Sequence, residues 1–332
     1  MRAIATGMTT IAVLVFGSGG ALASRGQIPD YLRFPAATVK QLKKDRSARV
    51  AAGSNRPVFI KVGDSNTATH LALYGLGCYR YKPKGLRSSL IKVVRRYRRT
   101  SLASGRLDVP GASCRNGNPD NSFSRISLAS RGGAYFSYAL EPGETYGLPC
   151  AGSILVCEIE ATGPRYAFIQ FGTNEALQAP EGDMSAGQLE EMRAQISEIV
   201  RACRSYRVTP VILTAPVALD GGNWTPGVPG RVVAINQMIR QTAKASRAPL
   251  IDLWLAQSEV IGPRFNYGLD KGGIHLSSSP NTDPWRGTVN LSILNRRRYG
   301  MNLRSYLILS ALEKLDSIKP RRGGRPQRHS AQ

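Results

Sequence analysis

The chain has 332 residues, of which 45 are lysine or arginine and 22 are aspartate or glutamate, so its formal net charge is +23. A hydrophobic fraction of 42% is enough for a sizeable core, which excludes a chain that is disordered throughout. The length fits one large domain or two small ones. Beyond the N-terminal segment, no stretch is apolar and long enough to span a bilayer.

The N-terminal segment has the three parts of an export signal. Arg2 supplies a positive charge, residues 11–16 (IAVLVF) form an apolar centre, and Ala21-Leu22-Ala23 forms a small-x-small cleavage site. A membrane anchor is the alternative, but glycine, serine and threonine interrupt the apolar stretch well short of the ~20 residues that a span requires. We therefore expect residues 1–23 to be a signal peptide and the mature protein to be secreted or periplasmic.

Export would place the five cysteines in an oxidising compartment. Cys203 and the apolar residues before it follow one another at helical spacing, so we expect Cys203 to be a buried free thiol on the core face of a helix. The other four lie in glycine-rich, loop-like sequence and can form two disulfides in any of three pairings: Cys78, Cys114, Cys150 and Cys157. No zinc site is indicated, since none of the three histidines neighbours a cysteine pair.

Basic residues occur in several clusters, namely residues 43–46, 95–99 and 295–300 and the C-terminal segment 319–332. Proline and glycine in the last of these predict a disordered basic tail. Each cluster alone is typical of a solvated face, but together they predict attraction to polyanions. For an exported protein these would be anionic cell-envelope polymers or a membrane surface. Nucleic acid is not favoured, because no nucleic-acid-binding motif accompanies the charge.

Residues 24–56 are mixed and basic, and we expect them to be a lead-in to a domain that spans residues 57–318. Within that domain, apolar runs typical of buried strands alternate with amphipathic runs typical of helices. The predicted strands are residues 58–64, 124–130, 165–174, 208–216 and 248–254. The predicted helices are residues 65–75, 185–207, 230–246 and 303–318.

Strands that are apolar at nearly every position, separated by helices, predict a parallel sheet covered on both faces. Right-handed crossovers then give an α/β three-layer sandwich with a doubly wound, mostly parallel five-stranded sheet, flavodoxin-like in strand order. In such sheets, ligands bind outside the carboxyl ends of the strands. Polar residues that follow the strands should therefore share one crevice.

Short polar blocks follow three of the predicted strands, and a fourth lies in a later loop. They are Gly63-Asp64-Ser65, Arg131-Gly132-Gly133, Gly172-Thr173-Asn174 and, in the loop, His275-Leu276-Ser277. A serine, a glycine, an asparagine and a histidine in this order resemble the four blocks of the SGNH (GDSL-type) hydrolase superfamily. The resemblance covers roughly residues 57–318. It implies the α/β fold expected above and the hydrolysis of esters by an activated serine.

The resemblance implies that Ser65 is the nucleophile and His275 its general base. A serine hydroxyl is a poor nucleophile until a neighbouring imidazole takes its proton. The plain structural alternatives are that Ser65 only caps the predicted helix 65–75 and that His275 is a loop histidine bonded to a carbonyl. His70 would point away from Ser65 on the same helix, and His329 lies in the predicted tail.

The tetrahedral intermediate of ester hydrolysis carries an oxyanion that needs two or three fixed hydrogen-bond donors. The resemblance implies that these are the N–H groups of Ser65 and Gly132 and the side chain of Asn174. Gly133 is an equal candidate, because the alignment of the second block can slip by one residue. Taken alone, Asn174 would be interpreted as a turn residue at the end of a strand.

The fourth block departs from the family pattern at the acid that orients the histidine. Family members usually carry an aspartate three residues before the histidine, and that position here is Gly272. The nearest carboxylate is Asp270, five residues before His275, which a slightly longer loop can return to the ring. Otherwise a Ser–His dyad operates, or the protein is a pseudoenzyme, since loss of the acid costs ~10⁴ in rate in serine proteases.

The sequence therefore predicts a secreted serine esterase that hydrolyses the O-acyl groups of a glycan or lipid through an acyl-enzyme at Ser65. The basic surface favours an ester on an anionic polymer or at an anionic membrane. No metal and no organic cofactor are implied. The alternatives are a catalytically impaired protein that binds acidic glycans or other polyanions, and an acyltransferase that excludes water from the acyl-enzyme.

Overall fold

The computed structural model of the protein describes residues 31–54, 56–105, 120–221 and 224–320. The predicted signal peptide, residues 1–23, lies outside the described residues, and so does the predicted tail from residue 321 onward. No helix within the described ranges is both long and apolar enough to cross a membrane.

A five-stranded sheet forms the centre of the molecule, in the order β1-β5-β4-β3-β2. The neighbouring strands β2, β3, β4 and β5 are parallel, and β1 pairs with β5 in the antiparallel direction. The strands are β1 (Leu32–Arg33), β2 (Phe59–Gly63), β3 (Tyr166–Gln170), β4 (Thr209–Leu213) and β5 (Leu250–Ile251). The predicted α/β class with a mostly parallel five-stranded sheet is confirmed.

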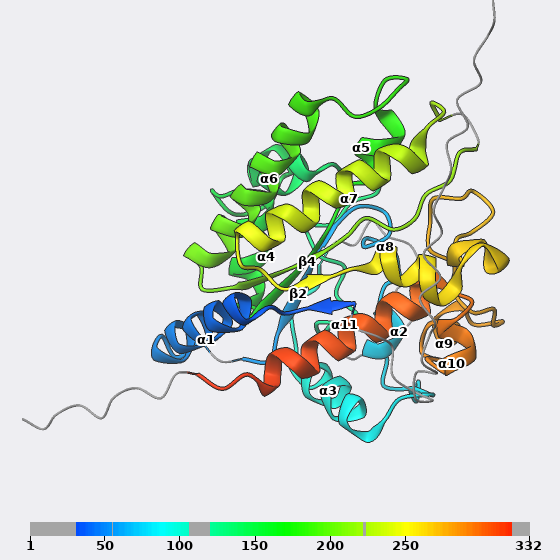
Figure 1. The fold of residues 1–332 in the computed structure, drawn as a ribbon. Helices are drawn as coiled ribbons and strands as arrows, with labels where there is room; N and C mark the ends of the chain where they lie inside the picture. The colour runs from blue at the N-terminus through cyan, green and yellow to red at the C-terminus, as the bar shows by residue number, and fades with distance from the viewer. Residues whose placement is uncertain (1–30, 55, 106–119, 222–223, 321–332) are drawn as a thin grey trace, which may run out of the picture.

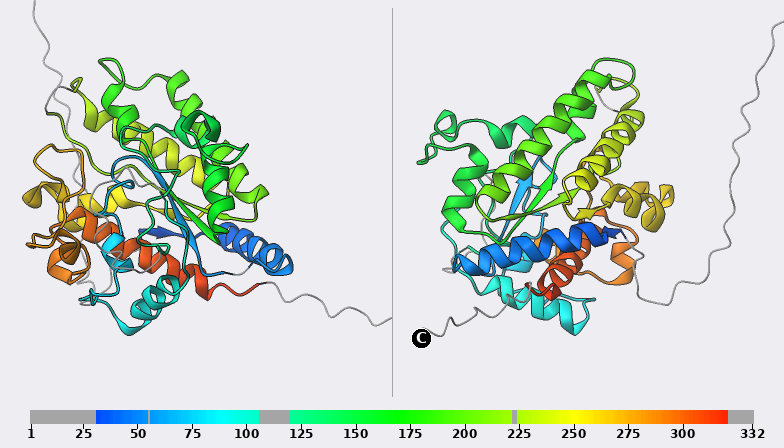
Figure 2. Two further views of the ribbon diagram at one scale, coloured as in Figure 1. Left: turned by 180° about the vertical axis from the view of Figure 1, so that it is seen from behind. Right: turned by 60° about the vertical axis from the view of Figure 1, so that its left-hand side comes forward.

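Helices cover both faces of the sheet, and the sheet separates two hydrophobic cores (Figure 1 and Figure 2). One face carries α4 (Ile154–Thr162), α6 (Ala186–Ser205) and α7 (Val228–Ala245), and the other carries α3 (Ser88–Arg98) and α11 (Gly300–Ser317). Every residue of β2, β3 and β4 is buried. Burial on both faces is why these strands are apolar at almost every position instead of at alternate ones.

The remaining elements are short, and along the chain most of them connect the strands with the longer helices. They are α2 (Tyr74–Gly77), α5 (Thr173–Gln178), α8 (Leu253–Ala256), α9 (Pro284–Thr288), α10 (Ile293–Arg296), 3-10 segments at Phe136–Leu140, Gly143–Tyr146 and Pro263–Gly268, and a π-helical turn at Gln257–Ile261.

The segment expected to be a basic lead-in contains regular structure. Strand β1 extends the sheet at β5, and α1 (Ala36–Ala51) follows it. The side chain of Arg49 on α1 is buried, and its Nη1 donates to the carbonyl of Arg165 at 3.0 Å and to Thr209 Oγ1 at 3.0 Å. Residues 31–51 are therefore attached to the sheet both by strand pairing and by a buried guanidinium.

The predicted strand at residues 124–130 is wrong. This segment consists mainly of turns and forms one isolated parallel bridge, between Ser130 and Gly63. Its N–H groups are bonded elsewhere: Leu128 N–H donates to the carboxylate of Glu158 at 3.0 Å, and Ala129 N–H donates to Ser127 Oγ at 3.1 Å. Because these donors are occupied, a full ladder to β2 cannot form. The segment still runs beside β2, where the flavodoxin-like order expects a strand.

The predicted helix at residues 65–75 is also wrong over most of its length. Residues 64–73 form turns and bends, and only α2 (Tyr74–Gly77) is helical. Leu73 has a positive φ of 69°, which a continuous right-handed helix does not allow. The buried Lys61 Nζ donates to the carbonyls of Phe123, at 2.8 Å, and Ala72, at 3.4 Å. The carbonyl of Ala72, which a continuous helix would use within itself, is thus bonded by a strand side chain.

A disulfide joins Cys150 to Cys157 with a Cα–Cα distance of 5.6 Å. Cys78 is also disulfide-bonded, to a partner outside the described residues. Cys203 is a buried free thiol on α6, as predicted, and burial raises its pKa to about 12, so the thiol is unreactive at neutral pH.

Replacement of both Cys150 and Cys157 by alanine should lower the free energy of unfolding by about 2.5 kcal/mol, because the cross-link restricts a short loop of the unfolded chain. Urea unfolding followed by circular dichroism measures the change. The control is the same comparison in the presence of a reducing agent, where the difference should vanish. A double variant as stable as the oxidised wild type would contradict a stabilising role for this bridge.

Candidate active site

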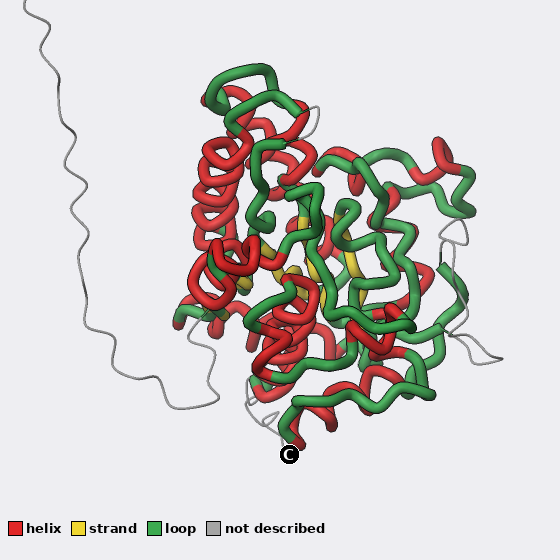
Figure 3. Tube along the Cα trace, turned by 90° about the vertical axis from the view of Figure 1, so that its right-hand side faces the viewer, coloured by secondary structure: helices red, strands yellow, loops and turns green. Residues whose placement is uncertain are grey.

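Loops gather at the edge of the sheet where the parallel strands end. Figure 3, which faces the right-hand side of Figure 1, shows these loops in front of the strands. The blocks at residues 63–65 and 172–174 directly follow β2 and β3. This is the edge at which parallel α/β sheets bind ligands.

Ser65 lies in a tight turn immediately after β2. The carbonyl of Asp64 accepts the N–H groups of Thr67 and Ala68, both at 2.9 Å, so the chain makes one helical turn and then leaves it. A Cβ at Gly63 would lie 2.3 Å from the carbonyl oxygen of Gln170, so only glycine fits at this position. Ser65 is half-buried, and its N–H donates to no other described residue.

His275 approaches Ser65 from a loop more than two hundred residues later in the chain. Its Nε2 lies 3.0 Å from Ser65 Oγ, within hydrogen-bond distance. The loop is closed by an antiparallel bridge between Leu269 and Leu276. The His275 side chain is 47% exposed, so an incoming substrate can reach the pair.

Asn66 links the loop that contains His275 to the turn that contains Ser65. Its Oδ1 accepts the N–H of Leu276 at 2.9 Å, and its Nδ2 donates to the carbonyl of Ile274 at 3.3 Å. The two bonds bracket His275 on either side, and Asn66 is buried. Sequence analysis did not single out this residue. Its position directly after Ser65 was the one available signal, since it places an amide beside the predicted nucleophile.

Asp270 lies near the other nitrogen of the imidazole. Its Oδ2 is 3.5 Å from His275 Nδ1, which is longer than an ordinary hydrogen bond. Asp270 N–H donates to the carbonyl of His275 at 2.8 Å, so the two residues face each other across the loop. The loop between them contains Gly272 at the position where the family usually carries its acid, and the chain folds back there to bring a more distant carboxylate to the ring.

Backbone hydrogen bonds hold the second block, residues 131–133, beside the first block, residues 63–65. Gly63 N–H donates to the carbonyl of Ala129, and Arg131 N–H donates to the carbonyl of Gly63, both at 3.0 Å. Gly133 has a φ of +74°, a conformation that favours glycine. The N–H groups of Gly132 and Gly133 form no hydrogen bond with other described residues, and both glycines are exposed. Either can therefore donate to an incoming oxygen.

The third block is joined to the second by the side chain of Asn174. This residue lies near the start of α5, and its Nδ2 donates to the carbonyl of Ala134 at 2.8 Å. The amide nitrogen of asparagine carries two hydrogens, so the second remains for another acceptor. The next residue, Glu175, accepts the N–H groups of Phe136, at 2.8 Å, and Gly172, at 3.0 Å. Two adjacent side chains thus connect α5 with the segment that follows Gly132.

Buried charged groups lie beneath the serine turn. Arg304 on α11 donates from Nε to Gln170 Oε1 at 2.6 Å and from Nη2 to Thr67 Oγ1 at 3.0 Å. Burial lowers the pKa of Arg304 to about 10, an effect that the negative charge of Asp64 partly offsets. Arg304 therefore connects the end of β3 with the turn that contains Ser65. Sequence analysis missed it because it lies within an apolar helix far along the chain.

Two buried carboxyl groups near this turn have raised pKa values. Burial raises the pKa of Asp64 to about 6, although a hydrogen bond from Asn66 N–H, at 2.9 Å, and the charge of Arg304 act in the opposite direction. Burial also raises the pKa of Glu175 to about 7, against the effect of its backbone hydrogen bonds. Perturbed carboxyl groups of this kind cluster at functional sites more often than elsewhere.

Of the other two histidines, His70 is described by the structure and its ring belongs to an aromatic cluster. The His70 ring packs against Tyr74, with ring centroids 4.6 Å apart, and against Trp285, at 6.2 Å. His329 lies outside the described residues. Within the described ranges, no group of three or more histidine, cysteine, aspartate or glutamate side chains has an arrangement that could hold a metal ion.

In the structure His275 Nε2 faces Ser65 Oγ and His275 Nδ1 faces Asp270. Hydrogen bonds join the second block to Gly63 and Asn174 to Ala134, which brings backbone and amide donors to the same edge of the sheet. A hydroxyl next to an imidazole is the arrangement required for nucleophilic attack on a carbonyl. A set of N–H donors next to that hydroxyl is the arrangement required to stabilise the oxyanion that results.

The sequence matches the model of the GDSL-like lipase/acylhydrolase family over residues 101–279, which is more than half of the chain. The matched segment contains Gly132, Asn174, Asp270 and His275, while Ser65 precedes it. The protein belongs to this family, whose fold is the SGNH hydrolase fold predicted from the four blocks. It is an enzyme of the class that hydrolyses ester bonds.

Several solved structures are similar to the protein at low sequence identity. A peptidoglycan O-acetylesterase aligns with a TM-score of 0.45 and 13% identity over 86% of this chain and 98% of its own. A GDSL-like lipase from Bacteroides thetaiotaomicron aligns with a TM-score of 0.41 and 15% identity, over 82% and 98% of the two chains. An acetylxylan esterase from Geobacillus stearothermophilus aligns with a TM-score of 0.40 and 11% identity, over 77% and 94%. No curated protein sequence matches the chain.

The raised pKa of Asp64 predicts a pH-dependent effect of the variant Asp64→Asn. The folded protein binds the Asp64 proton more tightly than the unfolded chain, so the wild type loses stability as the pH rises from about 4 to about 6. Asparagine does not titrate. The free energy of unfolding of the variant relative to wild type should therefore increase across this range, by up to about 3 kcal/mol.

Urea unfolding of both proteins at a series of pH values between 4 and 8 measures this difference. The exposed variant Asp183→Asn is the control, and its difference from wild type should stay constant. A constant difference for Asp64→Asn as well would mean that the pKa of Asp64 is not raised by folding.

Proposed function

We propose that the protein is an exported serine esterase in which Ser65 is the nucleophile and His275 the general base. The observation that carries the proposal is the 3.0 Å distance between Ser65 Oγ and His275 Nε2, two atoms that belong to distant parts of the chain. The N–H of Ser65, which donates to no other described residue, and the amide of Asn174, which bonds to Ala134 next to the second block, support the same chemistry.

The reaction proceeds in two halves. Ser65 Oγ attacks the carbonyl carbon of the ester while His275 Nε2 accepts the hydroxyl proton. The bond to the leaving oxygen then breaks, and the imidazolium returns the proton to that oxygen, so that an alcohol departs and an acyl-enzyme remains. Water attacks the acyl-enzyme with His275 again as the base. A carboxylic acid is released, and Ser65 regains its proton.

The oxyanion formed in each half is stabilised by the N–H groups of Ser65 and Gly132 and by Asn174 Nδ2. The N–H groups are unoccupied by other described residues, and the bond from Asn174 to the carbonyl of Ala134 holds the amide at a fixed position beside the second block. Fixed donors of this kind need no reorganisation during the reaction. Gly133 N–H is the alternative to Gly132, and both are exposed at the same turn.

Asp270 orients the imidazole and stabilises its positive charge. Its carboxylate lies on the Nδ1 side of the ring, opposite the nitrogen that faces Ser65. The distance of 3.5 Å and the 42% exposure of the Asp270 side chain make this contact weaker than a buried hydrogen bond to the ring. Asp270 is therefore a positioning residue of moderate effect.

The substrate class that we propose is an O-acylated glycan or lipid encountered outside the cytoplasm. Disulfide bonds at Cys150–Cys157 and at Cys78 support an oxidising compartment, in agreement with the predicted signal peptide. The net charge of +23 supports a substrate that carries, or lies near, negative charge.

The variant Ser65→Ala should lose p-nitrophenyl acetate hydrolysis by at least about 10³-fold, because the acyl-enzyme can no longer form. A fluorophosphonate probe should label the wild type at Ser65 and leave the variant unlabelled. Ser205→Ala, at the exposed end of α6, is the control and should keep both properties. A wild type that is neither active nor labelled, yet binds polyanions, would instead be a binding protein.

The variant Asp270→Asn should lower kcat for the same substrate by about 10- to 100-fold, less than the ~10⁴-fold effect of the buried aspartate in serine proteases. Asp270→Glu should restore part of the activity. If Asp270→Asn retains full activity, Ser65 and His275 act as a dyad.

A further inference from the structure

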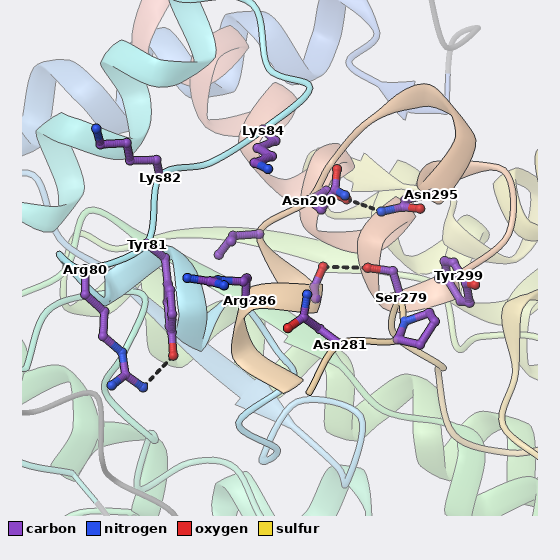
Figure 4. A pocket seen from close by; sticks show the side chains of 13 residues that line it. Arg80, Tyr81, Lys82, Lys84, Ser279, Asn281, Arg286, Asn290, Asn295 and Tyr299 are labelled. Atoms are coloured by element: carbon purple, nitrogen blue, oxygen red, sulfur yellow. Dashed lines mark hydrogen bonds between the residues drawn. The ribbon is translucent and has the colours of Figure 1, made fainter. Parts of the chain in front are cut away.

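We propose that a basic cavity next to the active site binds a carboxylate or phosphate group on the saccharide chain of the substrate. This cavity lies between residues 80–84 and the segment that contains α9 and α10 (Figure 4). The proposal rests on the esterase function above and specifies its substrate as an acidic glycan.

The cavity has the size and the composition of a small-ligand site. Its volume is about 520 Å³, within the usual range for pockets that hold small molecules. Figure 4 shows that Arg80, Lys84 and Arg286 come from two separate chain segments and line the same space. Lys82 also belongs to its lining.

The positive charges of the cavity are largely uncompensated. Lys82, Lys84 and Arg286 form no ion pair with any described carboxylate, and Arg80 is the one lining cation with an acidic neighbour, Asp283, at 3.7 Å. Like charges in one concave site repel each other and raise the local concentration of anions. The most direct way to relieve this repulsion is a bound anion.

The uncharged residues of the cavity suit a sugar. Three asparagines and a serine line it together with the ring of Tyr299: Asn281, Asn290, Asn295 and Ser279. Amide and hydroxyl groups can both donate to and accept from sugar hydroxyls. The wall is internally fixed, since Asn295 Nδ2 donates to the carbonyl of Asn290 at 3.0 Å and Ser279 Oγ donates to the carbonyl of Gly287 at 2.7 Å.

The cavity is close to the nucleophile. Ser279 follows His275 by four residues, so their Cα atoms are separated by at most about 14 Å even in a fully extended chain. On the other side, the ring of His70 packs against Trp285, the neighbour of Arg286 in α9, and His70 itself is in the segment that follows Ser65. One saccharide chain can therefore present an ester to Ser65 and an acidic group to the cavity.

An acidic glycan explains the site better than a membrane surface does. The exposed large hydrophobic residues on the segments that line the cavity are Tyr79, at 53% exposure beside Arg80, and Ile293 and Leu294 on α10, at 44% and 67%. Insertion into a bilayer generally needs a broader apolar face than these three residues provide. A concave wall of amides is, by contrast, a feature of ligand pockets.

The first test compares an acidic with a neutral substrate. The probes are O-acetylated oligogalacturonide and O-acetylated xylo-oligosaccharide, hydrolysed by wild type and by the double variant Lys84→Gln/Arg286→Gln. The wild type should prefer the acidic substrate, and the double variant should lose about tenfold of that preference in kcat/KM, as expected for two exposed charge contacts. Lys84→Glu changes the charge of the cavity by the same two units and should lower the preference by a similar factor. Both side chains are exposed, so neither change disturbs the core.

The control is Lys43→Gln/Lys44→Gln on α1, which removes the same charge at the opposite side of the molecule in Figure 1. It should retain the preference of the wild type. An equal loss in the control would mean that only the net charge attracts the substrate, and it would overturn the proposal. So would a wild type that shows no preference for the acidic substrate.

The second test measures binding without turnover, in the Ser65→Ala variant, so that an inactive enzyme would not hide the site. Calorimetric titration with trigalacturonate, with a glycerol phosphate oligomer and with neutral xylotriose distinguishes carboxylate from phosphate as the recognised group. Binding of either acidic probe that depends on Lys84 and Arg286 supports the proposal. Binding of neither, or binding only to phosphatidylglycerol vesicles, overturns it. If Ser65→Ala binds while the wild type hydrolyses no ester, the esterase function fails and the anion site stands.

Discussion

The contact between Ser65 and His275 depends on the amide of Asn66. Both its oxygen and its nitrogen bond to backbone groups that flank His275, and its own position is set by the turn that presents Ser65. The amide is buried, so water does not compete for these bonds. One side chain thus holds two parts of the chain together at the point where the proposed nucleophile meets the proposed base. The proposed reaction requires that this separation stay within hydrogen-bond distance.

Two charged side chains, Lys61 in β2 and Arg304 in α11, are buried at positions of the kind that apolar residues usually occupy. Lys61 is fully buried in β2, and burial lowers its pKa to about 7, while its Nζ bonds two loop carbonyls. Arg304 bonds the end of β3 and the serine turn from below. Buried charges of this kind cost stability but restrict the loops to a single arrangement, which a catalytic site of fixed donors needs.

Most of the architecture could be predicted from the sequence, and the two wrongly assigned segments have a common cause. The strands β2, β3 and β4 and the helices α6, α7 and α11 were predicted close to their observed bounds, because burial on a sheet or helix leaves a periodic pattern. Residues 124–130 were assigned wrongly because the side chain of Glu158 bonds a backbone N–H that a strand ladder would use. In residues 65–75 the side chain of Lys61 bonds the carbonyl of Ala72, and Leu73 has a positive φ. Sequence patterns report local preference and do not register such long-range bonds.

The candidate site, too, could be predicted from the sequence only in part. The sequence by itself determined which residue types follow β2 and β3, and hence that Ser65 and Asn174 lie at one edge, since parallel strands bring their carboxyl ends together. It did not determine how Gly132 reaches that edge without a strand before it, that Asp270 faces the imidazole, that Asn66 brackets His275, or that cations from residues 80–84 and α9 share a cavity. These features depend on how loops of irregular backbone fold against one another. Only tertiary packing decides that arrangement, because such loops have no periodic pattern that reveals it.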